Sequence, residues 1–401
     1  MHKKASKLRI SSFEVFTLGE PGKAGGATWA GISIMLRLTT SNGLVGYGEA
    51  VPTLRVKPVV ESLREVGRLY KGKDPADLEL NQHEWHKHDF YLPVSFESTT
   101  ALSAFDIACW DILGKQHGVP VHKLLGGSFR ESVRMYSNGW YSDCVTPEQF
   151  ASRAKKYAAM GYTGLKFDPF GRYYDWIDAP GLELAYERVK AVKDATKGKV
   201  ELLIEHHGRF NPNSAIMAAR KLEPLDPLFV EEPIHPDNIE ALRKYRSSTQ
   251  IRVALGERIL TKEHAAYVCS NHLTDFLQAD ITNIGGITQA KKVSAIAEAY
   301  GVEMAFHNAF GPIQNAATLQ VDATIPNFLI QESFYDVFPE WKRRLVKDGT
   351  PVLDGHSRVP KGPGLGVDVD ERVLKEHAFD GQEAFDPDEP VWIVKDTWKK
   401  A

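Results

Sequence analysis

The sequence is poor in cysteine, and this scarcity excludes two kinds of architecture. Its three cysteines, Cys109, Cys144 and Cys269, lie far apart along 401 residues. Isolated cysteines in odd number cannot build a disulfide framework or a CxxC zinc site. We therefore expect a protein of a reducing compartment, with the cytoplasm as the default location.

Long apolar runs and an excess of one charge are also missing. No run of about 18 apolar residues occurs, so we expect no membrane span, and residues 1–4 are basic without the apolar stretch of a signal peptide. Basic and acidic residues number 49 and 52, a net charge of -3. This balance gives no basic face for nucleic acid. A small acidic substrate stays compatible, because one local cation can dominate a pocket.

Motifs for nucleotide binding and serine catalysis are absent as well. Neither GxxxxGK followed by Ser or Thr nor GxSxG occurs in the sequence. The histidine-rich stretch 83–88 is not HExxH, because its second histidine comes one residue early. We expect a surface helix or loop there.

The first 130 residues have the pattern of an α+β domain. Two β-rich runs, 32–38 and 44–48, flank an Asn-Gly pair, which is a strong hairpin signal. Helical spacing of apolar residues follows at 57–70 and 98–117.

From residue 131 onward, short apolar runs alternate with helical segments. Thr146 and Gln149 predict a capping box at the start of the first of these helices. Eight alternations favour a (β/α)8 barrel of TIM type over residues 131–370, a typical length for that fold, although counting alone leaves a doubly wound sheet open. The eight runs are 133–136, 164–167, 200–204, 228–230, 251–255, 275–278, 302–306 and 328–330.

The remaining segment, 371–401, contains Trp392 and Trp398. We expect it to pack back on residues 1–130, so that the N-terminal α+β domain acts as a capping domain completed by the C-terminal tail.

Several of the apolar runs end in a polar or charged side chain. A barrel gathers the C-terminal ends of its strands at one mouth, where active sites form. We therefore expect these side chains to converge: Lys166, Asp168, Glu205, His207, Glu231, Glu257, Asp280, His307 and Glu332.

Three of these residues predict a metal site. Glu205, Glu231 and Glu257 are spaced by 26 residues, one strand–helix–strand unit each. A single carboxylate at a strand end is more often a helix cap or an ion-pair partner. Three at one mouth repel one another and stay partly protonated unless a cation joins them. An all-oxygen ligand set suits Mg²⁺ or Mn²⁺ rather than zinc.

The same mouth has candidate bases and an acid. Lys166 beside a divalent cation should have a lowered pKa and serve as a general base. Asp280 can accept the Nδ1–H of His307 and orient that ring as a second base. His207 is expected on the same strand face as Glu205, because two positions separate them. The histidine between them should point away.

The remaining candidates concern the substrate. Glu332, if protonated, can hydrogen-bond a substrate carboxylate. Trp29, Asp168 and Arg258 are candidate substrate-binding residues, Trp29 from a glycine-rich loop at 19–31 that can close over the mouth.

Taken together, these residues resemble the enolase superfamily, and within it the mandelate-racemase-like subgroup. The resemblance covers nearly the whole chain and is carried by Glu231-Glu232-Pro233, Gly256-Glu257-Arg258 and the Asp280 and His307 pair. The stretches 307–312 and 325–332, and the pattern Glu205-x-His207-Gly208-Arg209, are similar to galactonate-dehydratase-like acid-sugar dehydratases.

Two departures from the family pattern stand out. Glu205 takes a place where that family commonly has Asp. The racemase pattern has two lysines spaced by one residue, whereas this sequence has Lys166 and Asp168. These departures leave the substrate and the reaction open.

The resemblance implies a Mg²⁺-dependent enzyme, a carbon–oxygen lyase that forms homo-oligomers. It would remove the proton α to a carboxylate with His307 or Lys166. His207 would protonate the departing 3-hydroxyl, and the product would be a 2-keto-3-deoxy sugar acid. The alternatives are an epimerase or racemase that uses Lys166 and His307 on two faces, and a cycloisomerase of an anhydro or lactone sugar acid. A non-catalytic binding protein would lack the bases, which are all present here.

Overall fold

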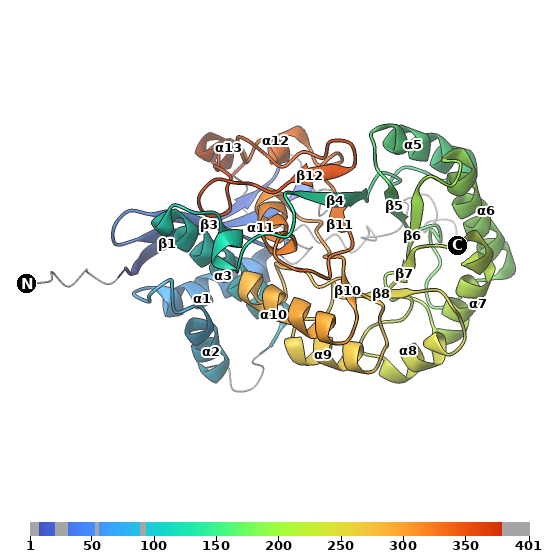
Figure 1. Cartoon of the computed structure of the whole chain (residues 1–401), viewed down its shortest axis with the longest axis horizontal. Coiled ribbons are helices and arrows are strands. Elements are labelled where there is room, and N and C mark those ends of the chain that lie inside the picture. Colours follow the sequence, from blue (N-terminus) through green and yellow to red (C-terminus); the bar gives the residue numbers. More distant parts are fainter. Residues whose placement is uncertain (1–7, 21–30, 53–55, 89–93, 379–401) are drawn as a thin grey trace, which may run out of the picture.

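The computed structural model of the chain describes residues 8–20, 31–52, 56–88 and 94–378. Its N-terminal part, here named the cap, is a three-stranded antiparallel sheet with helices packed on it (Figure 1). Apolar side chains of the sheet and of its helices form a core within the cap. The cap consists of β1 (Ile10–Leu18), β2 (Ser33–Thr40), β3 (Val45–Ala50), α1 (Val56–Tyr70), α2 (Leu78–His88) and α3 (Phe96–His117).

An Asn-Gly turn joins β2 and β3, as the sequence predicted. The strands pair antiparallel with Thr39 opposite Val45. Gly43 takes a φ of 85°, a region that glycine enters without steric cost. Helices α1 and α3 match the two predicted helices, and the exposed histidines of 83–88 lie at the end of α2.

Parallel strands and helices alternate after the cap. In Figure 1 the helices α5 to α8 form an arc outside the strands. The strands are β4 (Ser132–Ser137), β5 (Gly164–Phe167), β6 (Glu201–Glu205), β7 (Phe229–Glu231), β8 (Val253–Leu255), β9 (Phe276–Leu277), β10 (Glu303–Met304) and β11 (Gln331–Ser333). The main helices are α5 (Pro147–Ala159), α6 (Ala179–Ala195), α7 (Pro212–Leu222), α8 (Ile239–Arg246), α9 (Lys262–Ser270), α10 (Gly286–Ala299) and α11 (Pro312–Asp322).

Short elements complete the chain: α4 (Val121–Leu124), a 3₁₀ turn (Glu223–Leu225), α12 (Glu340–Arg343), β12 (His356–Arg358) and α13 (Glu371–Glu376). Strand β12 pairs antiparallel with β4. The predicted capping box is present at α5, where Thr146 and Gln149 each accept the backbone N–H of the other.

Backbone hydrogen bonds close the parallel sheet into a barrel. The strands follow one another in chain order from β4 to β10, and β11 pairs with β4. Met304 donates its N–H to Asn327 O at 2.7 Å, and Leu329 donates to Met304 O at 2.9 Å, so β10 is joined to the segment before β11. This closure excludes the doubly wound alternative. Side chains from around the ring fill its interior: Tyr136, Leu203, Phe229, Ala254, Phe276, Ala305 and Ile330.

The eighth predicted strand lies later than the sequence indicated. Residues 328–330 contribute only a bridge to Met304, whereas β11 is formed by Gln331–Ser333. All three residues of β11 are buried and polar. A prediction based on apolar residues therefore selects 328–330, the segment directly before β11.

Buried carboxylates of the cap join it to the barrel helices. Asp106 of α3 accepts the N–H of Thr288 at 3.0 Å, in the first turn of α10. Glu49 of β3 accepts the N–H groups of Ile313 and Gln314 at 3.1 and 2.9 Å, in the first turn of α11. Helix N-termini offer unpaired N–H groups and partial positive charge, so both contacts are favourable.

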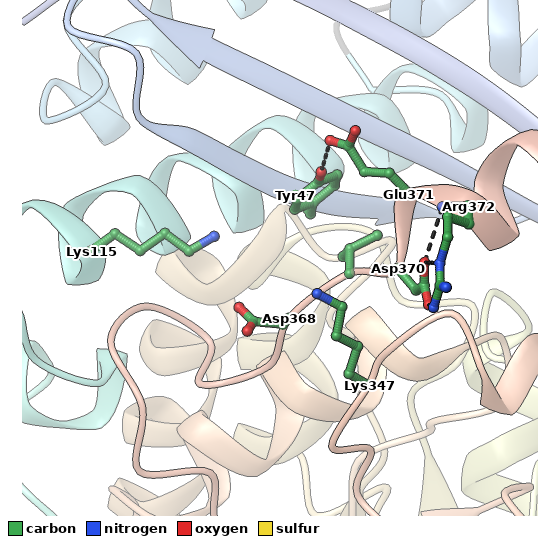
Figure 2. A pocket seen from close by; sticks show the side chains of 8 residues that line it. Tyr47, Lys115, Lys347, Asp368, Asp370, Glu371 and Arg372 are labelled. Atoms are coloured by element: carbon green, nitrogen blue, oxygen red, sulfur yellow. Dashed lines mark hydrogen bonds and ion pairs between the residues drawn. The ribbon is translucent and has the colours of Figure 1, made fainter.

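The last described residues return to the cap. Gly19 donates its N–H to His377 O at 2.9 Å, and Leu18 bridges Ala378. The Tyr47 hydroxyl donates to Glu371 Oε1 at 2.8 Å (Figure 2). The positions of Trp392 and Trp398, on which the predicted tail packing rested, lie outside the described residues. Across the described ranges, no helix is both long and apolar enough to cross a membrane.

Candidate active site

Charged side chains from successive strands meet at one mouth of the barrel. Parallel pairing aligns the C-terminal strand ends, as between Glu205 and Glu231, which are register partners. Lys166 contributes from β5, Glu205 from β6, Glu231 from β7 and Glu332 from β11, while Glu257, Asp280 and His307 follow β8, β9 and β10. The contacts below join all of them into one cluster, here named the mouth cluster.

Lys166 lies at the centre of the mouth cluster. Its Nζ is 2.7 Å from both carboxylate oxygens of Glu231, 2.8 Å from Glu332 and 3.4 Å from Glu205. Its side chain is 1% exposed. Burial opposes the charged ammonium, but Glu231 and Glu332 outweigh it and raise the pKa of Lys166. The lowered pKa expected from the sequence therefore has no support in the charges that surround this side chain.

The carboxylates of the mouth cluster differ in their protonation. Burial raises the pKa of Glu205 to about 7 and raises that of Glu231 well above its usual range. Glu257 is half-buried, and although desolvation opposes its charge, the positive charges of His307 and Arg258 lower its pKa to about 2. Glu205 and Glu231 therefore hold protons more readily than Glu257, which stays ionised.

Glu205, Glu231 and Glu257 suit a hard divalent cation by their chemistry. Their oxygen donors match Mg²⁺ or Mn²⁺, and burial, together with neighbouring carboxylates, raises the pKa values of Glu205 and Glu231. As the side chains stand, no set of three or more His, Cys, Asp or Glu residues in the described ranges is arranged to hold an ion. Lys166 lies between the carboxylates, so an ion would have to take over some of its contacts.

His307 and Asp280 form the predicted pair. The Nδ1 of His307 lies 2.5 Å from Asp280 Oδ2, and its Nε2 lies 3.3 Å from Glu257 and 3.7 Å from Glu332. Burial opposes the charged imidazolium, but Glu332 and Asp280 raise the pKa of His307 to about 10. The ring therefore carries its proton until further positive charge enters the cluster.

Glu332 is held by donors at both oxygens. Asn138 Nδ2 donates to Oε1 at 2.7 Å, and the Asn308 N–H donates to Oε2 at 3.0 Å. Although Glu332 is buried, the charges of Lys166 and His307 lower its pKa. The lowered pKa favours an ionised Glu332 in this arrangement, and its expected hydrogen bond to a substrate carboxylate stays a prediction.

His207 reaches the mouth by a different path from the one predicted. Strand β6 ends at Glu205, and His207 takes a left-handed φ of 54°. Alternation along a strand thus does not apply to it. Instead, its N–H donates to Glu205 Oε1 at 2.6 Å, and its Nδ1 lies 3.1 Å from Asp168 Oδ2.

Two predicted substrate-binding residues are used within the protein. Asp168 forms a two-point ion pair with Arg209 as well as contacting His207. Arg209 lowers the pKa of Asp168 despite burial of the carboxyl group. Arg258 pairs with Glu232 at 3.0 Å and with Glu257 at 3.4 Å. These ion pairs show how both side chains support the mouth cluster, and their roles toward a substrate stay predictions.

Two further expectations concern His206, which the structure describes, and Trp29, which lies outside the described residues. His206 points away from the cluster and lies between Phe170 and Phe210. Burial lowers its pKa to about 3. Trp29 and most of the loop at 19–31 lie outside the described residues.

Sequence reasoning missed several amides around the cluster. Asn138 follows β4 directly, so the same strand-end argument would have found it. Gln278 lies at the end of a predicted strand and donates to Glu231 Oε2 at 2.6 Å. Gln314 lies inside α11, where no periodic signal distinguishes it from a core residue.

A separate hollow of about 530 Å³ lies between the cap and the C-terminal segment (Figure 2). Tyr47, Lys115 and Glu371 are among its lining residues, and none of its lining residues belongs to the mouth cluster. Two of its charged side chains are paired, Arg372 with Asp370 at 2.8 Å and Lys115 with the neighbouring Asp111 at 2.7 Å. We therefore assign the chemistry to the mouth of the barrel.

Comparison with known families agrees with this geometry. The family model described as enolase C-terminal domain-like matches residues 149–373. The model of the mandelate racemase / muconate lactonizing enzyme N-terminal domain matches residues 24–126.

Individual relatives extend the match over nearly the whole chain. A D-gluconate/D-galactonate dehydratase of Picrophilus torridus is 47% identical over 97% of this chain and 99% of its own. A D-gluconate dehydratase of Thermoproteus tenax is 47% identical over 93% of this chain and 75% of its own. A solved mandelate racemase/muconate lactonizing enzyme from Sulfitobacter sp. superimposes with a TM-score of 0.86 at 32% identity, covering 93% of this chain and 96% of that one.

Proposed function

The chain belongs to the enolase superfamily, in its mandelate-racemase-like subgroup and close to the galactonate dehydratases, and from this premise we propose that it dehydrates acid sugars. It is an enzyme, a carbon–oxygen lyase. The proposed substrates are aldonic acids such as D-gluconate and D-galactonate, because relatives at 47% identity are named for them.

One observation carries the proposal. Two histidines of the mouth each contact a carboxylate that can orient the ring: His307 contacts Asp280, and His207 contacts Asp168. His307 lies 3.3 Å from Glu257, and the charges of His307 and Arg258 lower the pKa of that carboxyl to about 2 against the effect of burial. An elimination needs a base for the proton and an acid for the departing oxygen, and this arrangement supplies a candidate for each.

In the proposed reaction, His307 takes the proton from C2 of the substrate. The electron pair of that C–H bond forms the enediolate, whose collapse breaks the bond between C3 and its oxygen. His207 gives a proton to the leaving hydroxyl, which departs as water. The resulting enol becomes a 2-keto-3-deoxy sugar acid.

Glu205, Glu231 and Glu257 would hold the divalent cation, for which we propose Mg²⁺. When bound, the cation supplies positive charge that stabilises an enediolate and lowers the pKa values of neighbouring bases. Lys166, whose side chain is 1% exposed, adds a further positive charge beside the same carboxylates. Asn138 and Asn308 keep Glu332 oriented toward the mouth.

The contacts of Lys166 favour elimination over a reaction with two bases. Epimerisation would require Lys166 to exchange protons freely opposite His307. Its ammonium is instead shared among Glu231, Glu332 and Glu205, which raise its pKa. We therefore take His307 as the base; because carboxylates raise its pKa as well, its deprotonation would need the charge of the cation.

Proton NMR in D₂O tests the proposal. The enzyme with Mg²⁺ is incubated with D-gluconate, D-galactonate and a set of other aldonic, aldaric and anhydro sugar acids. We expect loss of the C2 proton signal together with new C3 methylene signals from at least one aldonic acid. Exchange of the C2 proton without new C3 signals would replace the proposal with an epimerase or cycloisomerase.

A further inference from the structure

Asp280 receives more hydrogen bonds than a simple partner of His307 requires. Besides the His307 ring, the backbone N–H and hydroxyl of Thr282 donate to Oδ1 at 2.7 and 2.5 Å. Gln314 Nε2 donates to both carboxylate oxygens, each at 2.9 Å. The two contacts from Gln314 fix the rotation of the carboxylate, and thereby the direction from which it holds the His307 ring.

The orientation of the Gln314 amide is itself determined. The N–H of Phe310 donates to Gln314 Oε1 at 2.7 Å, so the amide oxygen faces the backbone and the amide nitrogen faces Asp280. The side chain is fully buried. With the amide reversed, its oxygen would face the Asp280 carboxylate and its nitrogen would face the N–H of Phe310, so neither hydrogen bond could form.

The cap reaches the same glutamine through Glu49. This buried carboxylate accepts the backbone N–H of Gln314 at 2.9 Å and that of Ile313 at 3.1 Å. Ser33 of the neighbouring cap strand donates to Glu49 Oε1 at 2.9 Å. A Cβ on Gly311 would lie 1.9 Å from that same oxygen, so a larger residue at this position would displace the Glu49 carboxylate.

We propose that Gln314 is a positioning residue for the His307 and Asp280 pair, and that Glu49 makes this positioning depend on the cap. A continuous set of hydrogen bonds runs from β3 of the cap through the start of α11 to the ring of His307. The inference rests on the proposed function only in taking His307 as the base. It links the docking of the cap to the orientation of the base without any direct contact between them.

The variant Gln314→Met tests the first part, with Gln320→Met as its matched control. Gln320 is a fully buried glutamine on the same helix that donates to Pro360 O at 2.9 Å and Leu365 O at 3.1 Å. Each variant loses a similar number of amide hydrogen bonds. Of the two glutamines, Gln314 contacts Asp280 and Gln320 does not. Where Gln314→Met does not fold, Gln314→Asn retains the amide on a shorter side chain.

Two readouts separate positioning from general stability. The first is the far-downfield proton signal of the His307 Nδ1–H, identified by its loss in His307→Asn. The second is kcat and KM for the aldonic acid found by the NMR screen. We expect Gln314→Met to shift or remove the signal and to lower kcat by about tenfold or more, with KM within about threefold, as for groups that orient a functional ligand. Gln320→Met should retain both.

The outcomes are decisive for each part. An unchanged proton signal in Gln314→Met, or equal changes in Gln320→Met, would overturn the role of Gln314. Glu49→Gln should shift the signal in the same direction, and a wild-type signal and kcat there would overturn the role of the cap. An enzyme that turned over no sugar acid would refute the proposed function, while the proton signal would still decide this inference.

Discussion

At the scale of single residues, the mouth cluster is a balance of charge around one lysine. Glu231 contacts Lys166 through both oxygens, and Glu332 and Glu205 lie within 2.8 and 3.4 Å of the same ammonium. A bound divalent cation and the ammonium would compete for these oxygens. The lysine therefore stabilises the cluster without metal and weakens metal binding at the same time.

Lys166→Met should separate these two effects. Without metal the variant should unfold at a lower temperature, because breaking a buried ion pair costs on the order of 3–5 kcal/mol. Added Mg²⁺ should then raise its melting temperature more than it raises that of the wild type. Thermal unfolding with and without Mg²⁺ measures both quantities.

Glu231→Gln serves as the control for that experiment. It removes a proposed ligand and should abolish both turnover and the stabilisation by Mg²⁺. If Mg²⁺ stabilised Lys166→Met less than the wild type, the idea of competition would be refuted. Turnover retained by Glu231→Gln would refute the metal assignment.

At the scale of elements, the helices of the barrel are held by carboxylates from the cap. Asp106 binds the start of α10, where Thr288 donates through its N–H at 3.0 Å and its hydroxyl at 2.5 Å. A Cβ on Gly286 would lie 2.4 Å from Asp106 Oδ1, so this approach also requires glycine. Despite these donors, burial raises the pKa of Asp106 to about 7.

This raised pKa predicts a pH dependence of folding. Between about pH 4 and 7 the unfolded chain ionises Asp106 while the folded protein keeps it protonated. The group should therefore contribute its full stability at low pH and lose about 1.4 kcal/mol per pH unit until about pH 7. Asp106→Asn should lack this loss.

Urea unfolding of both proteins from pH 4 to 8 measures the difference. Subtracting the two curves removes the groups that both share. We expect the stability of the wild type relative to Asp106→Asn to fall as the pH rises and to level off above about pH 7. A difference that stays constant over this range would contradict the raised pKa.

Most helices and strands are predictable from the sequence, whereas the contacts that hold the side chains of the mouth cluster in place are not. The strand ends at Glu231 and Glu257 follow clear apolar runs, and the barrel then brings them together by its symmetry. Strand β11 was displaced in the prediction because its buried residues are polar. Strand periodicity also fails where a turn begins, because the left-handed φ of His207 breaks the alternation of side chains along the strand.

A single sequence does not reveal which distant residues form ion pairs and hydrogen bonds with the residues of the site. Asp168 was predicted to face the substrate, but Arg209 pairs with it through two contacts. Gln314 lies 34 positions from Asp280, and no spacing rule connects an amide inside a helix to a carboxylate after a strand.

At the scale of the whole molecule, the cap and the barrel share buried contacts that neither can satisfy alone. Glu49 and Asp106 would each lose helix N–H donors if the cap left the barrel. Each such hydrogen bond contributes about 0.5–1.5 kcal/mol net, and more where one partner is charged. The two parts should therefore unfold together.

Scanning calorimetry of the whole chain tests this expectation. We expect one transition in the wild type, and in Glu49→Gln a single transition at a lower temperature. The melting temperature should fall by about 1 °C for each kcal/mol lost, because the entropy of unfolding grows with chain length. Two separated transitions in either protein would show that the cap unfolds on its own.

The return of the last described segment to the cap has a consequence for synthesis. Tyr47 and its partner Glu371 are separated by 324 positions in the chain. A ribosome that adds about 5–20 residues per second needs roughly 15–65 s to cover that distance. During this interval the strands of the cap are already outside the ribosome without their C-terminal partners, so a nascent chain that stops before residue 371 leaves the edge of the cap exposed to chaperones and proteases.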